Sequence, residues 1–352
     1  MKWRRKRPSG SRQLALWRAL CGDIGLLASW PSHQPDATAT SKRLGILRTC
    51  GLFACPSALT GRGAQLPSDP VNQAPRTRRL NLGYLLGMAK LRDAPISAKD
   101  LADFATTSSD FGFEMQVLTR LRAGGFSCSH SGTYRDPVTA KIRQFDIRAS
   151  ADRDDSTLAL AVECKNLRPN NPLLLSAVPR TSAEAFHDLL VCRPLATYTQ
   201  FLVQPVAKIA SAYKPGEMVG KNTDQVGKVM SGELVSDDEA TFDKLNQAVN
   251  SCQDLVRTFS LKVDPPLRRA IVPVLVVPTG LLWQVEYDAD GTITMPPHQV
   301  KRSALFLDHP WTAMSVYGDP ISYRLSHIEM VTFEALTGIA ELWLGPGGFF
   351  PP

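Results

Sequence analysis

The chain has 352 residues, of which 43% are hydrophobic and 21% charged. This balance is typical of a globular protein and excludes collagen, a coiled coil and wholesale disorder. The net charge of +7 invites a nucleic-acid interpretation. However, residues 1–80 hold 14 basic and 3 acidic side chains, whereas residues 81–352 hold 26 and 30. Net charge is therefore weak evidence about what the folded part binds.

Residues 1–80 are rich in Arg, Pro, Ser and Gly and lack sustained periodicity, which predicts a basic, disordered tail. Two alternatives stay open for this segment. It could touch nucleic acid, or it could lie upstream of the true start, with Met88 as the initiator. Arg18 and Asp23 interrupt the stretch that a secretory signal would need, which argues against a signal peptide.

Seven cysteines are scattered along the chain without zinc-like spacing, which predicts reduced, buried thiols in a cytoplasmic protein. No run of 18 apolar residues occurs, so we expect no membrane-spanning helix and no membrane partner.

Regular patterning begins after residue 81. Apolar residues at helical spacing, alternating stretches and Gly-, Asp- or Pro-containing turns distinguish the predicted helices from the strands. The predicted elements are a short helix over 99–104 capped by Ser97, a helix over 109–123, and strands over 126–134, 142–149 and 158–165.

The second half mixes helices with apolar strands. We predict helices over 183–190, 197–212, 237–259 and 333–344, and strands over 271–277, 281–287 and 327–332. Either one α/β domain with a helical insertion or two closely packed parts fits this order. The expected division is a core over 81–200, a helical region over 201–265, and a C-terminal α/β region over 266–352 packed on the core.

Polar residues on the first group of elements share one predicted face. In the strand over 158–165, Glu163 and Lys165 point opposite to the apolar Cys164. If this strand pairs with the preceding one as a hairpin, Asp146 joins Glu163 and Lys165. Its neighbours Phe145 and Ile147 then join the core.

Two such carboxylates suit Mg²⁺, a hard cation that takes oxygen ligands and keeps several waters. The cation polarises a phosphoryl oxygen and makes bound water a better nucleophile. Lys165 could hold the phosphate, and Glu114 of the preceding helix could add a carboxylate. The alternative is a solvated hairpin face with ordinary ion pairs.

Four strings over residues 108–167 carry a resemblance to a known family. They resemble the PD-(D/E)xK nuclease superfamily, in which a helix glutamate precedes a strand aspartate and then a (D/E)-x-K strand. The resemblance implies an α/β fold with a restriction-endonuclease-like core: a central mixed β-sheet flanked by helices, with helical and C-terminal β elaborations. Phe145 replaces the proline of the motif, which reduces its specificity. The strings are Phe111-Gly112-Phe113-Glu114, Gly124-Gly125-Phe126, Phe145-Asp146-Ile147 and Val162-Glu163-Cys164-Lys165.

By this resemblance Asp146, Glu163 and the backbone carbonyl of Cys164 bind Mg²⁺, for which Mn²⁺ can substitute. Glu114 assists the metal, and Lys165 positions water and phosphate. The implied function is a nuclease, an endodeoxyribonuclease that hydrolyses DNA phosphodiester bonds in restriction, repair or defence. RNA as substrate and a homodimer for double-strand cutting stay open. The alternative is a catalytically silent nucleic-acid-binding or scaffolding module on the same fold.

Tyr134, Lys141 and Arg143 lie on or beside the predicted hairpin and are weaker candidates for contacts with substrate phosphates. The interpretation we favour for them is the solvated side of two strands.

Overall fold

The computed structural model describes residues 94–107, 109–236, 239–259, 267–315 and 318–351. The predicted tail over 1–80 and the candidate initiator Met88 lie outside these residues. From Ile96 onward the described residues belong to one compact unit. Within them no helix combines the length and apolar character needed to cross a membrane.

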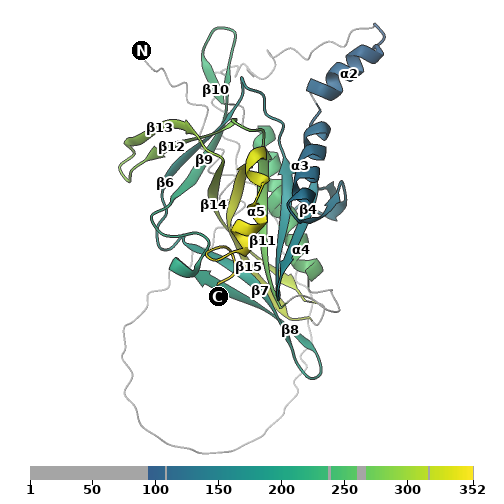
Figure 1. Ribbon diagram of the computed structural model, residues 1–352, viewed down its shortest axis with the longest axis vertical. Coiled ribbons are helices and arrows are strands. Elements are labelled where there is room, and N and C mark those ends of the chain that lie inside the picture. Colours follow the sequence, from purple (N-terminus) through teal and green to yellow (C-terminus); the bar gives the residue numbers. More distant parts are fainter. Residues whose placement is uncertain (1–93, 108, 237–238, 260–266, 316–317, 352) are drawn as a thin grey trace, which may run out of the picture. The chain divides into compact units, whose positions relative to one another are not determined.

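Two helices open this unit. Helix α2 (Ala98–Thr107) begins at Ser97, whose hydroxyl accepts a hydrogen bond from the Asp100 N–H at 3.1 Å, as the predicted cap requires. Helix α3 (Phe111–Ala123) buries its apolar stripe and ends before Gly125, whose φ of 89° suits glycine. Both predicted helices are confirmed. Figure 1 shows α2 beyond the end of α3 and away from the sheet, and none of its residues is buried.

Three antiparallel strands follow: β1 (Ser127–His130), β4 (Ile147–Arg153) and β5 (Ser156–Cys164). The predicted hairpin is confirmed, with Ile147 opposite Val162. Between β1 and β4 a separate two-stranded sheet is formed by β2 (Thr133–Arg135) and β3 (Ile142–Gln144). The predicted strands over 126–134 and 142–149 are therefore each divided in two. The first breaks at Ser131, which has a φ of 54°, and the second at the bend that contains Asp146.

The strands β1, β4 and β5 form one end of a 13-stranded mixed sheet, whose main path runs in the order β1-β4-β5-β11-β15-β14-β9-β6-β12-β13. Strand β11 (Arg268–Val277) runs parallel to both β5 and β15 (Pro320–Thr332). The remaining strands are β6 (Leu173–Pro179), β7 (Phe186–Pro194), β8 (Thr199–Ala207), β9 (Met218–Lys228), β10 (Leu234–Ser236), β12 (Leu282–Tyr287), β13 (Ile293–Gln299) and β14 (Arg302–Met314). Strands β7, β8 and β10 belong to the same sheet but lie off its main path.

Two helix predictions are wrong. The segments 183–190 and 197–212 contain the strands β7 and β8, which pair with each other, followed by a single 3-10 turn at Lys208–Ala210. Strand β7 also pairs with β11. Pairing with a buried neighbour decides the conformation of such short apolar segments, because intrinsic propensity is a weak preference. The region 201–265 therefore holds strands as well as a helix.

The long predicted helix is confirmed as α4 (Glu239–Phe259), with residues 237–238 undescribed. The predicted C-terminal helix is divided into a 3-10 turn (Phe333–Leu336) and α5 (Ile339–Leu344), because the chain turns at Gly338 with a φ of 79°. The predicted strands over 271–277 and 327–332 lie within β11 and β15, and the one over 281–287 matches β12 except for Leu281.

The sheet is covered on both faces near β5. Helix α3 packs with Leu160, Val162 and Cys164, whereas α4 packs on the face that carries Ala159 and Ala161. All nine residues of β5 are consequently buried. The face of β5 that carries Glu163 therefore lies under α4. The charged face of an ordinary hairpin would instead be exposed to solvent.

Candidate functional site

Asp146 and Glu163 lie side by side where β4 begins and β5 ends. Asp146 lies in the bend just before β4, and Glu163 is the penultimate residue of β5. The register that places Ile147 opposite Val162 makes the two carboxylates neighbours. Both are buried, with relative exposures of 9% for Asp146 and 1% for Glu163. Charged groups this deeply buried need a partner, since removal from water strongly disfavours the ionised form.

That partner is Lys244 of α4. Its ammonium lies 2.6 Å from Asp146 Oδ2 and 3.1 Å from Glu163 Oε2. Asp146 Oδ2 also accepts a hydrogen bond of 2.8 Å from the backbone N–H of Cys164. The Lys244 ammonium thus bridges two carboxylates. One belongs to the bend before β4 and the other to β5, while the lysine itself belongs to α4.

Helix α4 is held above the site by a second polar contact. Arg148 of β4 donates to Asp254 Oδ2 at 2.9 Å and to the hydroxyl of Ser251 at 3.2 Å. Its guanidinium also lies 4.3 Å from the centre of the Phe145 ring. Phe145 is therefore buried beneath Arg148, whereas Ile147 joins the core of α3 as predicted. This contact fixes the position of α4, and hence that of Lys244.

The pair of carboxylates is electrostatically strained. Burial, reinforced by Asp146 and opposed by Lys244, raises the pKa of Glu163 to about 8. Glu163 Oε1 is buried and has no hydrogen-bond partner among the described residues. A buried carboxyl oxygen without a donor costs free energy unless a proton or a cation satisfies it. The site therefore retains capacity for positive charge even with Lys244 in place.

Glu114 adds a third carboxyl group from the first turn of α3. Its Oε2 lies 3.2 Å from His130 Nε2 at the end of β1. Burial, followed by the charge of Asp146, raises the pKa of Glu114. The structure therefore brings Asp146 and Glu163 together on Lys244, whereas the Glu114 carboxyl group contacts His130.

Lys165 lies just past the end of β5, and its backbone N–H donates to the Val276 carbonyl at 2.9 Å. Its side chain is half-buried. In the described part of the chain, the amine that contacts the carboxylates belongs to Lys244 and not to Lys165. The thiol of Cys164 is buried, which raises its pKa, and Cys164 closes β5 next to Asp146.

Of the weaker candidates, Tyr134 and Arg143 lie in the small β2–β3 sheet, and Lys141 lies just before β3. Tyr134 is buried, and its hydroxyl donates to the Gln247 carbonyl of α4 at 3.3 Å. The Arg143 guanidinium is 3.7 Å from Asp136, and Lys141 is exposed. Tyr134 therefore anchors α4.

Sequence reasoning missed Lys244 and His130. Lys244 stands 81 positions beyond Glu163, and no local pattern connects the two. The available signal was a lysine beside the buried stripe of α4, directly before Leu245. His130 could have been considered because it lies at the end of the strand after the helix that carries Glu114.

Among the residues that the structure describes, no three His, Cys, Asp or Glu side chains are arranged to hold a metal ion. No family model matches the chain, and neither a curated protein nor a solved structure matches it.

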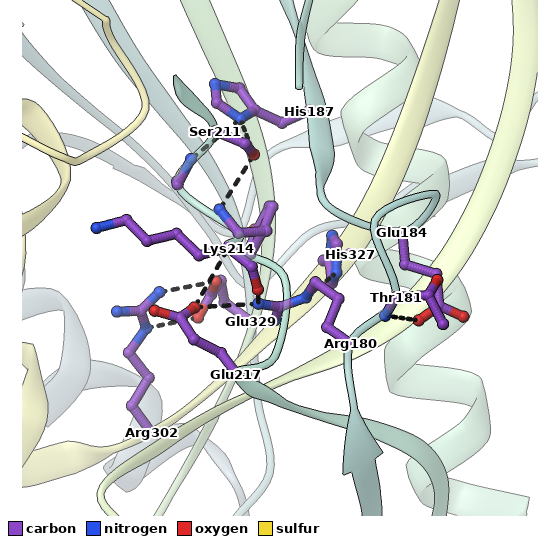
Figure 2. Close-up of polar contacts among 12 residues, drawn as sticks. Arg180, Thr181, Glu184, His187, Ser211, Lys214, Glu217, Arg302, His327 and Glu329 are labelled. Atoms are coloured by element: carbon purple, nitrogen blue, oxygen red, sulfur yellow. Dashed lines mark hydrogen bonds and ion pairs between the residues drawn. The ribbon is translucent and has the colours of Figure 1, made fainter. Parts of the chain in front are cut away.

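A second polar cluster lies further along the sheet (Figure 2). Arg180 donates to His327 Nε2 at 3.2 Å and to Glu217 at 3.1 Å, and Arg302 binds Glu329 at 2.7 and 3.1 Å. Burial lowers the pKa of His327 to about 2, so its imidazole is neutral. The cluster therefore pairs each arginine with one carboxylate.

Beside this cluster, Ser211 Oγ lies 2.9 Å from His187 Nδ1, and His187 Nε2 lies 2.7 Å from the Phe349 carbonyl. The pair resembles a nucleophile with its base. However, Ser211 is only 1% exposed, so a substrate cannot reach its hydroxyl. The contact instead fastens the C-terminal segment to β7.

Proposed function

We propose that this chain is a Mg²⁺-dependent nuclease that hydrolyses phosphodiester bonds of DNA. The observation that carries the proposal is the meeting of Asp146 and Glu163 on the ammonium of Lys244. Two buried carboxyl groups that share one amine form an acidic centre whose chemistry suits holding a cation or moving a proton.

The order of the elements supports the same proposal. A helix carries Glu114, the bend before β4 carries Asp146, and β5 carries Glu163. This is the order that the resemblance to the PD-(D/E)xK superfamily requires. The mixed sheet with α3 and α4 on its two faces is compatible with a restriction-endonuclease-like core.

The donor chemistry of the site fits Mg²⁺. Asp146 and Glu163 would hold the cation, with the Cys164 carbonyl as a further oxygen ligand and Glu114 assisting. The unpartnered Glu163 Oε1 is an oxygen that a cation would satisfy. When bound, Mg²⁺ would neutralise charge on the scissile phosphate and acidify a water molecule.

The remaining chemistry belongs to the chain. Lys244 neutralises part of the acidic charge and keeps the two carboxylates together. Lys165, at the end of β5, is the candidate for contact with the substrate phosphate. The covering helices exclude water from Glu163, so that a charge on its carboxylate interacts more strongly with neighbouring groups than it would in water.

The test is to incubate the purified chain with plasmid, linear and single-stranded DNA in the presence of Mg²⁺ or Mn²⁺. We expect cleavage that Asp146→Asn lowers at least about 100-fold, the scale of losing one main charge-stabilising group. Lys165→Ala serves as a second variant. Equal cleavage by the wild type and Asp146→Asn would trace the activity to a contaminant and remove the proposal.

One observation favours a second candidate, a catalytically silent nucleic-acid-binding or scaffolding module. Lys244 already bridges the carboxylates, and the described residues include no ready group of three metal donors. The two candidates differ in metal-dependent thermal stability, since a ligand that binds only the folded state raises its melting temperature. A nuclease should be stabilised by Mg²⁺ or Mn²⁺ through Asp146, whereas a silent module should not.

A further inference from the structure

The Lys244 ammonium occupies the point at which the two buried carboxylates converge. Its Nζ atom lies 2.6 Å from Asp146 Oδ2 and 3.1 Å from Glu163 Oε2, so one monovalent cation contacts both groups. A divalent cation bound by both carboxylates needs the same space, because Mg²⁺ lies only about 2.0–2.1 Å from each of its oxygen ligands. The ammonium and a metal ion are therefore competitors for Asp146 and Glu163.

The ammonium leaves the two carboxyl groups incompletely satisfied. Glu163 Oε1 is buried and has no hydrogen-bond partner among the described residues. Lys244 carries one positive charge, whereas the ionised side chains of Asp146 and Glu163 together carry two negative charges. A divalent cation supplies the second positive charge and takes more oxygen ligands than an ammonium has protons to donate. It can therefore take the place of the ammonium.

Lys244 can leave the carboxylates without a movement of α4. The hydroxyl of Tyr134 donates to the Gln247 carbonyl at 3.3 Å, and Arg148 donates to Asp254 at 2.9 Å. Both contacts hold the helix independently of the lysine. The Lys244 side chain is 17% exposed, and its ammonium ends a flexible four-carbon stem. The ammonium can therefore turn towards water while the helix stays in place.

We propose that Lys244 is a built-in cation that holds Asp146 and Glu163 together until a divalent metal ion displaces it. Lys244 thereby sets the metal affinity of the acidic centre. The inference rests on the proposed nuclease function and goes beyond it, because it gives Lys244 control over metal loading. Without Lys244, the two carboxylates repel each other and have no internal competitor for the metal.

Metal binding by the full chain, measured without DNA, tests this role. Lys244→Met removes the charge but keeps a long side chain, whereas Lys244→Arg is the matched control that keeps the charge. The probe is Mn²⁺, and the electron paramagnetic resonance signal of the free ion reports how much is bound. Melting temperatures of all the variants check that they are folded.

We expect Lys244→Met to bind Mn²⁺ at least about 10-fold more tightly than the wild type, the lower end of what one neighbouring charge does to the proton affinity of a carboxylate. Lys244→Arg should bind Mn²⁺ within about threefold of the wild type, because arginine stays charged. Adding Asp146→Asn to Lys244→Met should abolish the tight binding, which assigns it to the acidic centre. Unchanged, weaker or absent Mn²⁺ binding by folded Lys244→Met would overturn the inference.

Acetylation of the wild type decides the question should Lys244→Met not fold. An amine that pairs with two carboxylates reacts slowly with acetic anhydride, and mass spectrometry of the digested chain measures the modification at each lysine. We expect Mn²⁺ to raise the acetylation of Lys244 severalfold and to leave that of the exposed Lys141 unchanged. Acetylation of Lys244 that does not respond to Mn²⁺ would overturn the inference.

The role of Lys244 and the nuclease function fail separately. Tighter Mn²⁺ binding by Lys244→Met, lost on adding Asp146→Asn, without DNA cleavage in Mg²⁺ would support the displaced lysine and refute the nuclease. Cleavage that depends on Asp146, together with Mn²⁺ binding that Lys244→Met does not tighten, would do the reverse.

Discussion

The acidic centre and the arginine cluster are both built from charged side chains, but only the second balances its charges. Arg180 and Arg302 face the carboxylates of Glu217 and Glu329 one to one (Figure 2). At the acidic centre, by contrast, Asp146 and Glu163 share the single ammonium of Lys244. Burial, followed by the charge of Asp146, raises the pKa of Glu163.

The two clusters differ in whether a ligand is needed to complete them. A structural ion pair is complete without a ligand, whereas a site that binds a cation must keep unsatisfied negative charge until the ligand arrives. Removing a carboxylate should therefore destabilise the arginine cluster but relieve the acidic centre.

The largest expected effect on stability is at Glu329, which is fully buried and held by Arg302 through two hydrogen bonds. Glu329→Ala leaves the guanidinium of Arg302 without its carboxylate. We expect a loss of about 3–5 kcal/mol in the free energy of unfolding, measured by urea denaturation. A loss below about 1 kcal/mol would show that the arginine cluster is not a structural element.

The next effect separates the two lysines of the acidic centre. Lys244→Met removes the amine that bridges Asp146 and Glu163, and we expect a loss of about 3 kcal/mol near neutral pH. Lys165→Met is the matched control and should change stability by less than about 0.5 kcal/mol. If both variants unfold at the same urea concentration as the wild type, Lys244 does not stabilise the carboxylate pair.

A smaller effect follows from pH. Burial raises the pKa of Glu163 from 4.5 to about 8, so the folded state holds this proton more tightly than the unfolded chain does. The stability that this proton contributes is present at low pH and is lost as pH rises from about 4.5 towards 8. Glu163→Gln should remove that loss.

Thermal unfolding of the wild type and of Glu163→Gln between about pH 5 and pH 8 measures this difference. We expect the two free energies of unfolding to diverge by at least about 1 kcal/mol across the range, with the variant favoured at high pH. Parallel curves would mean that the carboxyl of Glu163 titrates as in water.

The smallest effect concerns the pair of Ser211 and His187. Ser211→Ala removes two buried hydrogen bonds, the one with His187 Nδ1 and the one that the hydroxyl accepts from the Tyr213 N–H, and should cost about 1 kcal/mol of stability. DNA cleavage in Mg²⁺ should stay unchanged, because the hydroxyl is shielded from substrate. A large loss of cleavage in a folded Ser211→Ala protein would show that the reaction takes place at Ser211 and His187 instead.

The elements with the clearest periodicity could be predicted from the sequence. The stripe of α3, the long amphipathic α4 and the hairpin of β4 and β5 were all predictable, because side-chain direction repeats every 3.6 residues in a helix and every two in a strand. That hairpin also brought Asp146 beside Glu163, since their elements are neighbours in the chain.

Features that depend on contacts between distant segments could be found only in the tertiary structure. The predicted helix over 183–190 became β7 because β8 and β11 supply its hydrogen bonds. Lys244 reached the carboxylates because α4 packs across β5, a contact that no local pattern encodes. Short-range periodicity fixes which face a residue occupies, whereas the partner that covers that face depends on how the whole sheet assembles.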